Sequence, residues 1–182
     1  MRERETREQR ATVYAWEDTC LVCRAWCGRL GPFEAVTPEA RVMVIEAATA
    51  YTTGLWRRHV HQYRPLHSAV PSVDVRFAGL EPVNGAHSNA KQHTITISQA
   101  CAHKSWVIHE VAHLFTPGDH HGSAWRRCAM RMWEDEFGIP VERSRRQAAE
   151  HGIELSACPR ILSPRPGWLP NCSHRFPNGE QE

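Results

Sequence analysis

The sequence predicts a single α+β domain in which helices surround a small sheet. Most of the chain places apolar residues three or four apart, as on one side of a helix. Two short stretches near the middle instead alternate apolar and polar residues, as in a half-buried strand. The length of 182 residues suffices for one well-buried core but is short for two full domains.

Two helices are predicted in the N-terminal third of the chain. The first spans about residues 12–30, where an apolar stripe precedes a Gly-Pro pair. The second begins at Thr37 and Pro38, because threonine can cap a first helical turn and proline fits its first position. Its apolar stripe continues to about Arg64, which is followed by another proline.

The alternating stretches predict two strands, and the chain after them predicts three more helices. The strands are expected over residues 73–77 and 93–98, as antiparallel neighbours in a small sheet. The helices are expected over residues 105–115, 123–137 and 140–151. A Thr-Pro-Gly-Asp turn ends the first of these helices, and a glycine follows the last.

The two ends of the chain are predicted to lie outside the packed domain. Residues 1–10 are charged at nearly every position and predict a flexible arm, whereas residues 156–182 form a proline-rich tail expected to be extended or disordered. The domain is therefore expected over residues 11–155.

Charge and hydropathy predict a cytoplasmic protein without a membrane span. Lys and Arg number 22 against 20 Asp and Glu, so the net charge of +2 gives no general attraction to nucleic acid or membrane surfaces. The longest apolar run, residues 42–45, is stopped by Glu46, and neither a signal peptide nor a spanning helix is predicted. In a reducing cytosol the seven cysteines are expected as thiols or metal ligands.

The helix predicted over residues 105–115 carries the sequence His109-Glu110-Val-Ala-His113, an H-E-x-x-H pattern. The two histidines lie about one helical turn apart, within reach of a single zinc ion. Glu110 lies beside them, too far around the helix to be a natural ligand but placed to accept a proton from a metal-activated water. The pattern therefore predicts a hydrolytic zinc site.

A catalytic zinc needs a third protein ligand, and the sequence offers several. In the metzincin pattern Thr116 would stand in place of a glycine and Asp119 in place of a ligand, so that pattern fails. A thermolysin-like arrangement would use Glu134 from the following helix. His120 and His121 are nearer, and because consecutive residues point apart, only one of them is expected to bind.

Local sequence favours His121 as the third ligand. Gly122 follows it directly and leaves the backbone free for an unusual turn, while Ser123 can cap the helix that begins there. A ligand at the edge of a helix is held more rigidly than one on an open loop, so His120 is expected either to face outward or to support a ligand without binding the metal itself.

The H-E-x-x-H pattern is followed closely by His121-Gly122 and the aromatic Trp125. With this combination the chain resembles SprT-like zinc metalloproteases, and also a family of small metallohydrolases from actinobacteria and their phages. The similarity covers about residues 11–155 in order, including residues 13–18, a helix ending at 55–58 and the paired strands, but only the zinc motif is specific. The resemblance implies a zincin-like fold, a zinc cofactor and a third ligand at His121. The cysteine cluster and the proline-rich tail depart from the family pattern.

Other clusters in the sequence have structural interpretations. Cys20, Cys23 and Cys27 have the spacing of thiolate ligands and could find a fourth partner in the tail, but the same spacing is an apolar helical stripe, and core packing is favoured. Six arginines could bind phosphate, but interleaved acids favour a solvated face. These arginines are Arg126, Arg127, Arg131, Arg143, Arg145 and Arg146. His87 and His93 would line the site if their strands border it.

The sequence therefore predicts a zinc metallohydrolase, most simply a metallopeptidase acting on a peptide or protein. His109, His113 and His121 are the expected metal ligands and Glu110 the general base. The alternatives are a non-catalytic zinc-stabilised domain that binds nucleic acid or protein, and a zinc hydrolase acting on a non-peptide amide. Hydrolysis also requires a donor for the developing oxyanion, such as a Tyr or His, which the sequence does not single out.

Overall fold

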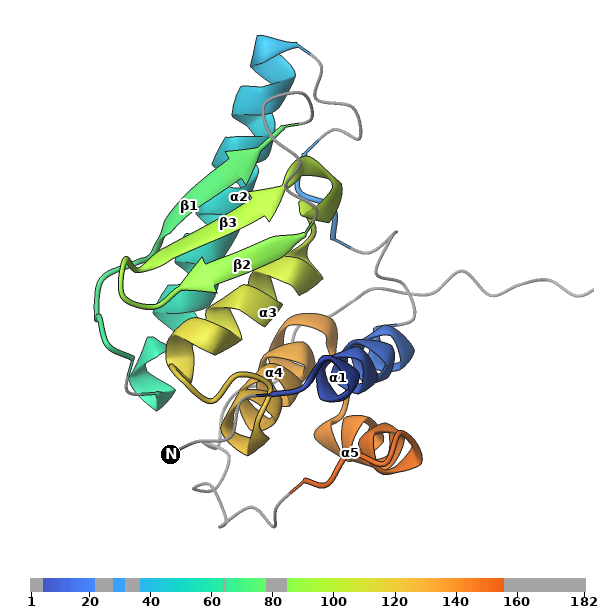
Figure 1. Cartoon of the computed structure of the whole chain (residues 1–182). Coiled ribbons are helices and arrows are strands. Elements are labelled where there is room, and N and C mark those ends of the chain that lie inside the picture. The colour runs from blue at the N-terminus through green and yellow to red at the C-terminus, as the bar shows by residue number, and fades with distance from the viewer. Residues whose placement is uncertain (1–4, 22–27, 32–36, 64, 78–84, 156–182) are drawn as a thin grey trace, which may run out of the picture.

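The computed structural model describes residues 5–21, 28–31, 37–63, 65–77 and 85–155. These residues form five α-helices, two short 3₁₀-helices and a three-stranded sheet in one domain (Figure 1), which confirms the α+β class. The helices are α1 (Arg7–Cys20), α2 (Pro38–His59), α3 (Lys104–Phe115), α4 (Ser123–Phe137) and α5 (Val141–Glu150). The strands are β1 (Ser72–Arg76), β2 (Ala86–Asn89) and β3 (Thr94–Ser98), and the 3₁₀-helices are η1 (Val60–Gln62) and η2 (Gln99–Cys101).

The sheet differs from the predicted antiparallel pair, because a third strand lies between the two in sequence. The spatial order is β1-β3-β2, with β1 parallel to β3 and β2 antiparallel to β3. The additional strand, β2, reverses the chain once more, so β3 runs in the same direction as β1. The sequence of β2, Ala-His-Ser-Asn, has no apolar alternation, because this edge strand buries little of its surface.

Helix α1 begins earlier and ends earlier than predicted. Thr6 caps it in a capping box with Gln9, so the helix starts within the stretch predicted to be a charged arm. It ends at Cys20 instead of near residue 30. Residues 1–4, Cys23 and Cys27 lie outside the described residues, as does the predicted tail over residues 156–182.

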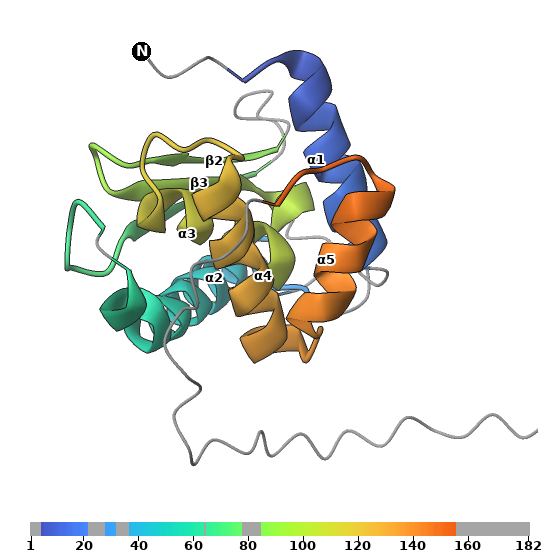
Figure 2. The same cartoon turned by 90° about the horizontal axis from the view of Figure 1, so that it is seen from below.

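The elements are arranged in three layers (Figures 1 and 2). Helices α2 and α3 lie against the sheet, and α4 packs on α3 from the opposite side. Helix α5 contacts both α4 and α1, which lie at the far side of the domain from the sheet. Trp16 of α1 links this layer together, because its ring packs against Trp133 of α4 at 5.2 Å and its indole nitrogen donates to the Ser144 carbonyl of α5.

Helix α3 is therefore enclosed between the sheet and the other helices. Its Val107, Ile108 and Val111 are fully buried in the core. Helices α4 and α5 follow the predicted spans closely, with Gly138 and Gly152 at positive φ just after them, as expected for glycine at a helix end. Among the described helices, none has the length and apolar character needed to cross a membrane.

Candidate metal centre

Helix α3 carries the two histidines of the H-E-x-x-H pattern on one side. They are four residues apart, so their side chains project from successive turns in nearly the same direction. Nε2 of His113 lies 3.3 Å from Nε2 of His109. His109 is buried, and His113 is partly buried.

The turn after α3 brings a third imidazole to the same point. Nε2 of His121 lies 3.1 Å from Nε2 of His109. The ligand atoms of His109, His113 and His121 all lie within 4.8 Å of one another, and this group can hold a metal ion. The structure thus brings together the three histidines that were predicted to bind metal.

The position of His121 depends on Asp119 rather than on the predicted Ser123 cap. Oδ2 of Asp119 accepts hydrogen bonds from the backbone nitrogens of Ala124 and Trp125, at 2.9 and 3.0 Å, and so satisfies the first turn of α4. Gly122 is the N-cap residue and has an ordinary negative φ. Glycine is needed there for space, because a Cβ would lie 2.7 Å from Oδ2 of Asp119.

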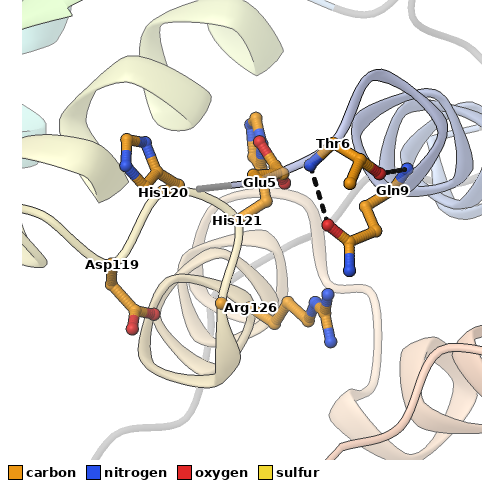
Figure 3. A pocket seen from close by; sticks show the side chains of 8 residues that line it. Glu5, Thr6, Gln9, Asp119, His120, His121 and Arg126 are labelled. Atoms are coloured by element: carbon orange, nitrogen blue, oxygen red, sulfur yellow. Dashed lines mark hydrogen bonds and ion pairs between the residues drawn. The ribbon is translucent and has the colours of Figure 1, made fainter. Parts of the chain in front are cut away.

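The two competing candidates for the third ligand lie elsewhere. His120 is exposed, with a left-handed φ of 50° that turns its side chain away from His121 (Figure 3). Glu134 is directed towards Arg131, 2.6 Å away, and also accepts a hydrogen bond from the backbone of Val141. Neither residue belongs to the group of side chains that can hold a metal.

Two carboxylates from the N-terminal segment contact the outer nitrogens of these histidines. Both oxygens of Glu17 lie 3.0 Å from Nδ1 of His109, and those of Glu5 lie 3.0 and 2.9 Å from Nδ1 of His121. A carboxylate at such a position accepts a hydrogen bond from Nδ1–H, an arrangement that in metal sites directs Nε2 to the ion. Neither residue was predicted from the sequence, although Glu17 falls within the buried stripe of α1 beside Val13 and Trp16, an unusual place for an acid.

The three imidazoles are electrostatically suited to bind a cation. Burial lowers the pKa of His113 well below its usual range, and the neighbouring His109 and His121 lower it further. Burial and His109 also lower the pKa of His121, against the opposing effect of Glu5. These shifts favour neutral His113 and His121, whose unprotonated ring nitrogens offer lone pairs that can bind a cation.

The distances also fit zinc. Nitrogen ligands at about 2.0–2.1 Å in tetrahedral geometry are separated by about 3.3 Å. The two observed separations between Nε2 atoms, 3.3 and 3.1 Å, are close to this value. In addition, Glu17 is fully buried, and burying a carboxylate is costly unless positive charge lies nearby. The donor set, its spacing and its charge therefore all suit a divalent ion.

Glu110 follows His109 on α3 and is buried. Burial raises the pKa of its carboxyl group, while His109 and a hydrogen bond with Ser88 of β2 act in the opposite direction. A buried carboxylate next to a metal site is suited to accept a proton from water at neutral pH. The contact with Ser88 also places the edge strand β2 next to this part of the site.

Trp125 seals the buried side of the histidine group. Its ring is fully buried and contacts the rings of His109, His113 and His121 at centroid distances of 4.8, 5.3 and 4.6 Å. Its indole nitrogen donates to the His109 carbonyl oxygen. An aromatic residue at this position therefore excludes water from one side of the site and fixes the three rings against each other.

The other sequence candidates lie outside this group. Cys20 is buried in the core, where burial raises the pKa of its thiol to about 11. Arg131 pairs with acids of its own helix, and Arg126 donates to the Glu154 carbonyl, as on a solvated face. The His93 ring packs against Trp56, away from the metal ligands.

A pocket of about 200 Å³ lies on the outer side of His121 (Figure 3). It is lined by polar side chains of the N-terminal segment and of the turn before α4. These residues are Glu5, Thr6, Gln9, Asp119, His120, His121, Gly122 and Arg126. Glu5, which contacts Nδ1 of His121, also lines the pocket. The pocket therefore lies on the Nδ1 side of the His121 ring, whereas Nε2 faces the other two histidines.

Comparisons of this chain with protein-family models, curated proteins and solved structures gave no match.

Proposed function

We propose that this protein is a zinc-dependent hydrolase that cleaves peptide bonds, with His109, His113 and His121 as metal ligands and Glu110 as general base. The observation that carries the proposal is the convergence of three imidazole nitrogens, two of them from the helix that also carries the buried Glu110. A zinc ion bound there would lower the pKa of a water molecule and polarise a substrate carbonyl.

Glu110 favours a catalytic site over a purely structural one. A structural zinc site needs no base and is usually closed by four protein ligands. Here the group of side chains that can hold a metal provides three ligands, and an additional carboxylate is buried beside them. Glu110 would accept a proton from the attacking water and later transfer it to the departing amine.

The edge strand favours a peptide as the substrate. In the described part of the chain, β2 pairs only with β3 and lies against α3. An extended peptide can add to such an edge through backbone hydrogen bonds. This would bring a scissile amide close to Glu110, which shares a hydrogen bond with Ser88 of that strand. The resemblance of the zinc motif to SprT-like proteases agrees with this substrate class.

The proposal is tested with zinc-loaded full-length protein and its Glu110→Gln variant. Both are incubated with denatured casein and a fluorogenic peptide mixture, and new N-termini are counted by mass spectrometry. The wild type should cleave, and the variant should retain zinc but lose cleavage, because an amide cannot accept the proton. Equal cleavage by both proteins, or a zinc-loaded wild type that cleaves nothing, would contradict the function. Loss of zinc from the variant would show that Glu110 is a ligand.

A further inference from the structure

Tyr14 of α1 lies at the histidine group, one helical turn before Glu17. Its ring centroid lies 5.6 Å from that of His109 and 5.5 Å from that of His121. A third neighbour is Trp106 of α3, at 6.3 Å. The phenol is therefore held among aromatic rings that belong to, or adjoin, the metal site.

The exposure of the surrounding residues shows from which side a substrate can approach. Trp125 is fully buried and closes one side of the histidine group. Tyr14, Trp106 and His113 are only partly buried. These three residues therefore mark the side of the histidine group from which we expect a substrate to approach.

The hydroxyl of Tyr14 is free to bind a substrate. It makes no hydrogen bond with any other residue that the structure describes. A phenol ordinarily keeps its proton at neutral pH, so the Tyr14 hydroxyl is an available hydrogen-bond donor at the histidine group.

We propose that Tyr14 is a catalytic residue whose hydroxyl donates a hydrogen bond to the carbonyl oxygen of the substrate as that oxygen becomes negatively charged. This inference rests on the proposed hydrolytic function. As the water oxygen bonds to the carbonyl carbon, its proton passes to Glu110 and the C=O π electrons move to the oxygen that Tyr14 contacts. The C=O bond re-forms as the C–N bond breaks, and the amine takes the proton from Glu110. Tyr14 keeps its own proton throughout.

Arg10 is the other donor on the same side of α1, four residues before Tyr14. Its Nε lies 3.4 Å from the Glu5 carboxylate, and its side chain is 52% exposed. An arginine that is already paired and largely hydrated is less suited to a developing oxyanion than a free phenol. The variant Arg10→Gln therefore serves as a comparison.

The test compares Tyr14→Phe with Tyr51→Phe, a matched exchange outside the site, where the hydroxyl donates to Glu136. Zinc content is measured first and should equal that of the wild type. With a cleaved peptide, kcat of Tyr14→Phe should fall by about 10²-fold with little change in KM, because one oxyanion donor is lost. Tyr51→Phe should keep the wild-type kcat.

Ligand binding provides a readout that does not depend on turnover. A dipeptide phosphonate presents oxyanions in tetrahedral geometry, whereas 2-mercaptoethanol binds zinc through sulfur and presents none. Calorimetry should show phosphonate binding at least about 10-fold weaker in Tyr14→Phe, with thiol binding unchanged. Equal phosphonate binding by Tyr14→Phe and wild type, an equal loss for both ligands, or the loss appearing in Arg10→Gln instead would overturn the role of Tyr14. If the wild type binds the phosphonate through Tyr14 but cleaves no peptide, only the proposed function fails.

Discussion

Both carboxylate oxygens of Glu17 lie 3.0 Å from Nδ1 of His109, and neither side chain is more than 2% exposed. Glu17 comes from α1 and His109 from α3, so the first helix of the domain supplies a partner to the helix that carries the H-E-x-x-H pattern. The carboxylate fixes the tautomer of the imidazole, directs Nε2 towards the other two histidines and makes that nitrogen a stronger ligand.

Glu17→Gln is expected to weaken zinc binding by about 10–100-fold, the range typical for loss of such an outer partner. The glutamine keeps the size of the side chain and can still accept a hydrogen bond, but it removes the negative charge. Zinc affinity is measured by competition with a chromophoric chelator. Glu8→Gln, an exposed exchange on the same helix, is the control and should bind zinc as the wild type does. Equal affinities of the two variants would mean that Glu17 does not support the metal.

Elemental analysis of the purified full-length protein should give one zinc per chain. Three neutral imidazoles form a nitrogen site that suits this ion, although related divalent metals can substitute. Because zinc binds only the folded site, adding it to metal-free protein should raise Tm in a concentration-dependent manner. No bound metal would contradict the site, and two equivalents would point to a second site at Cys20, Cys23 and Cys27.

Asp119→Ala should destabilise the protein by about 1 kcal/mol, the typical cost of removing a side chain that caps a helix. The carboxylate accepts hydrogen bonds from two backbone nitrogens of α4 and holds the turn that carries His121. Urea denaturation of the metal-free proteins gives the free energy of unfolding. Ser123→Ala is the matched control and should change it little, because Ser123 is the first residue of α4 and not its cap. If Ser123→Ala lowered the free energy of unfolding more than Asp119→Ala, Ser123 would be the cap of α4, as the sequence predicted.

Local patterns predicted most of the helices, and the errors lie where the local pattern is weak or hidden by charged residues. Helix α3, with apolar residues on one side and histidines on the other, follows its periodicity closely. The sheet was predicted less well, because β2 is too short and too polar to show alternation. Without β2, β3 was expected to run antiparallel to β1, whereas the two strands are parallel. The beginning of α1 was missed because charged residues concealed the capping box of Thr6 and Gln9.

The three histidines of the candidate metal site could be brought together from the sequence because they lie within 13 residues of one another, in a recognisable pattern. Their partners could not be predicted in the same way. Glu17 is 92 residues from His109, and Glu5 is 116 residues from His121, so only the folded chain brings each pair together. Tyr14 lies on the same helix as Glu17 and is likewise far from His109 and His121 in the sequence. A glutamate within an apolar helical stripe was the one local sign that α1 carries a buried polar contact.

His121→Ala should release zinc far more readily than His120→Ala, although the two residues are adjacent. Nε2 of His121 lies 3.1 Å from that of His109, and its Nδ1 is held by Glu5, so its removal takes away one of three ligands. His120 is exposed and turned away by its left-handed backbone, so its removal leaves the group intact. Zinc affinity is measured by transfer of the ion to a chelating dye. His121→Ala should lose more than the roughly 100-fold that removal of a ligand's hydrogen-bond partner can cost. His120→Ala should bind zinc nearly as tightly as the wild type. Circular dichroism of both variants serves as the control for folding. Release from His120→Ala as readily as from His121→Ala would show that the turn before α4 presents a different histidine to the metal.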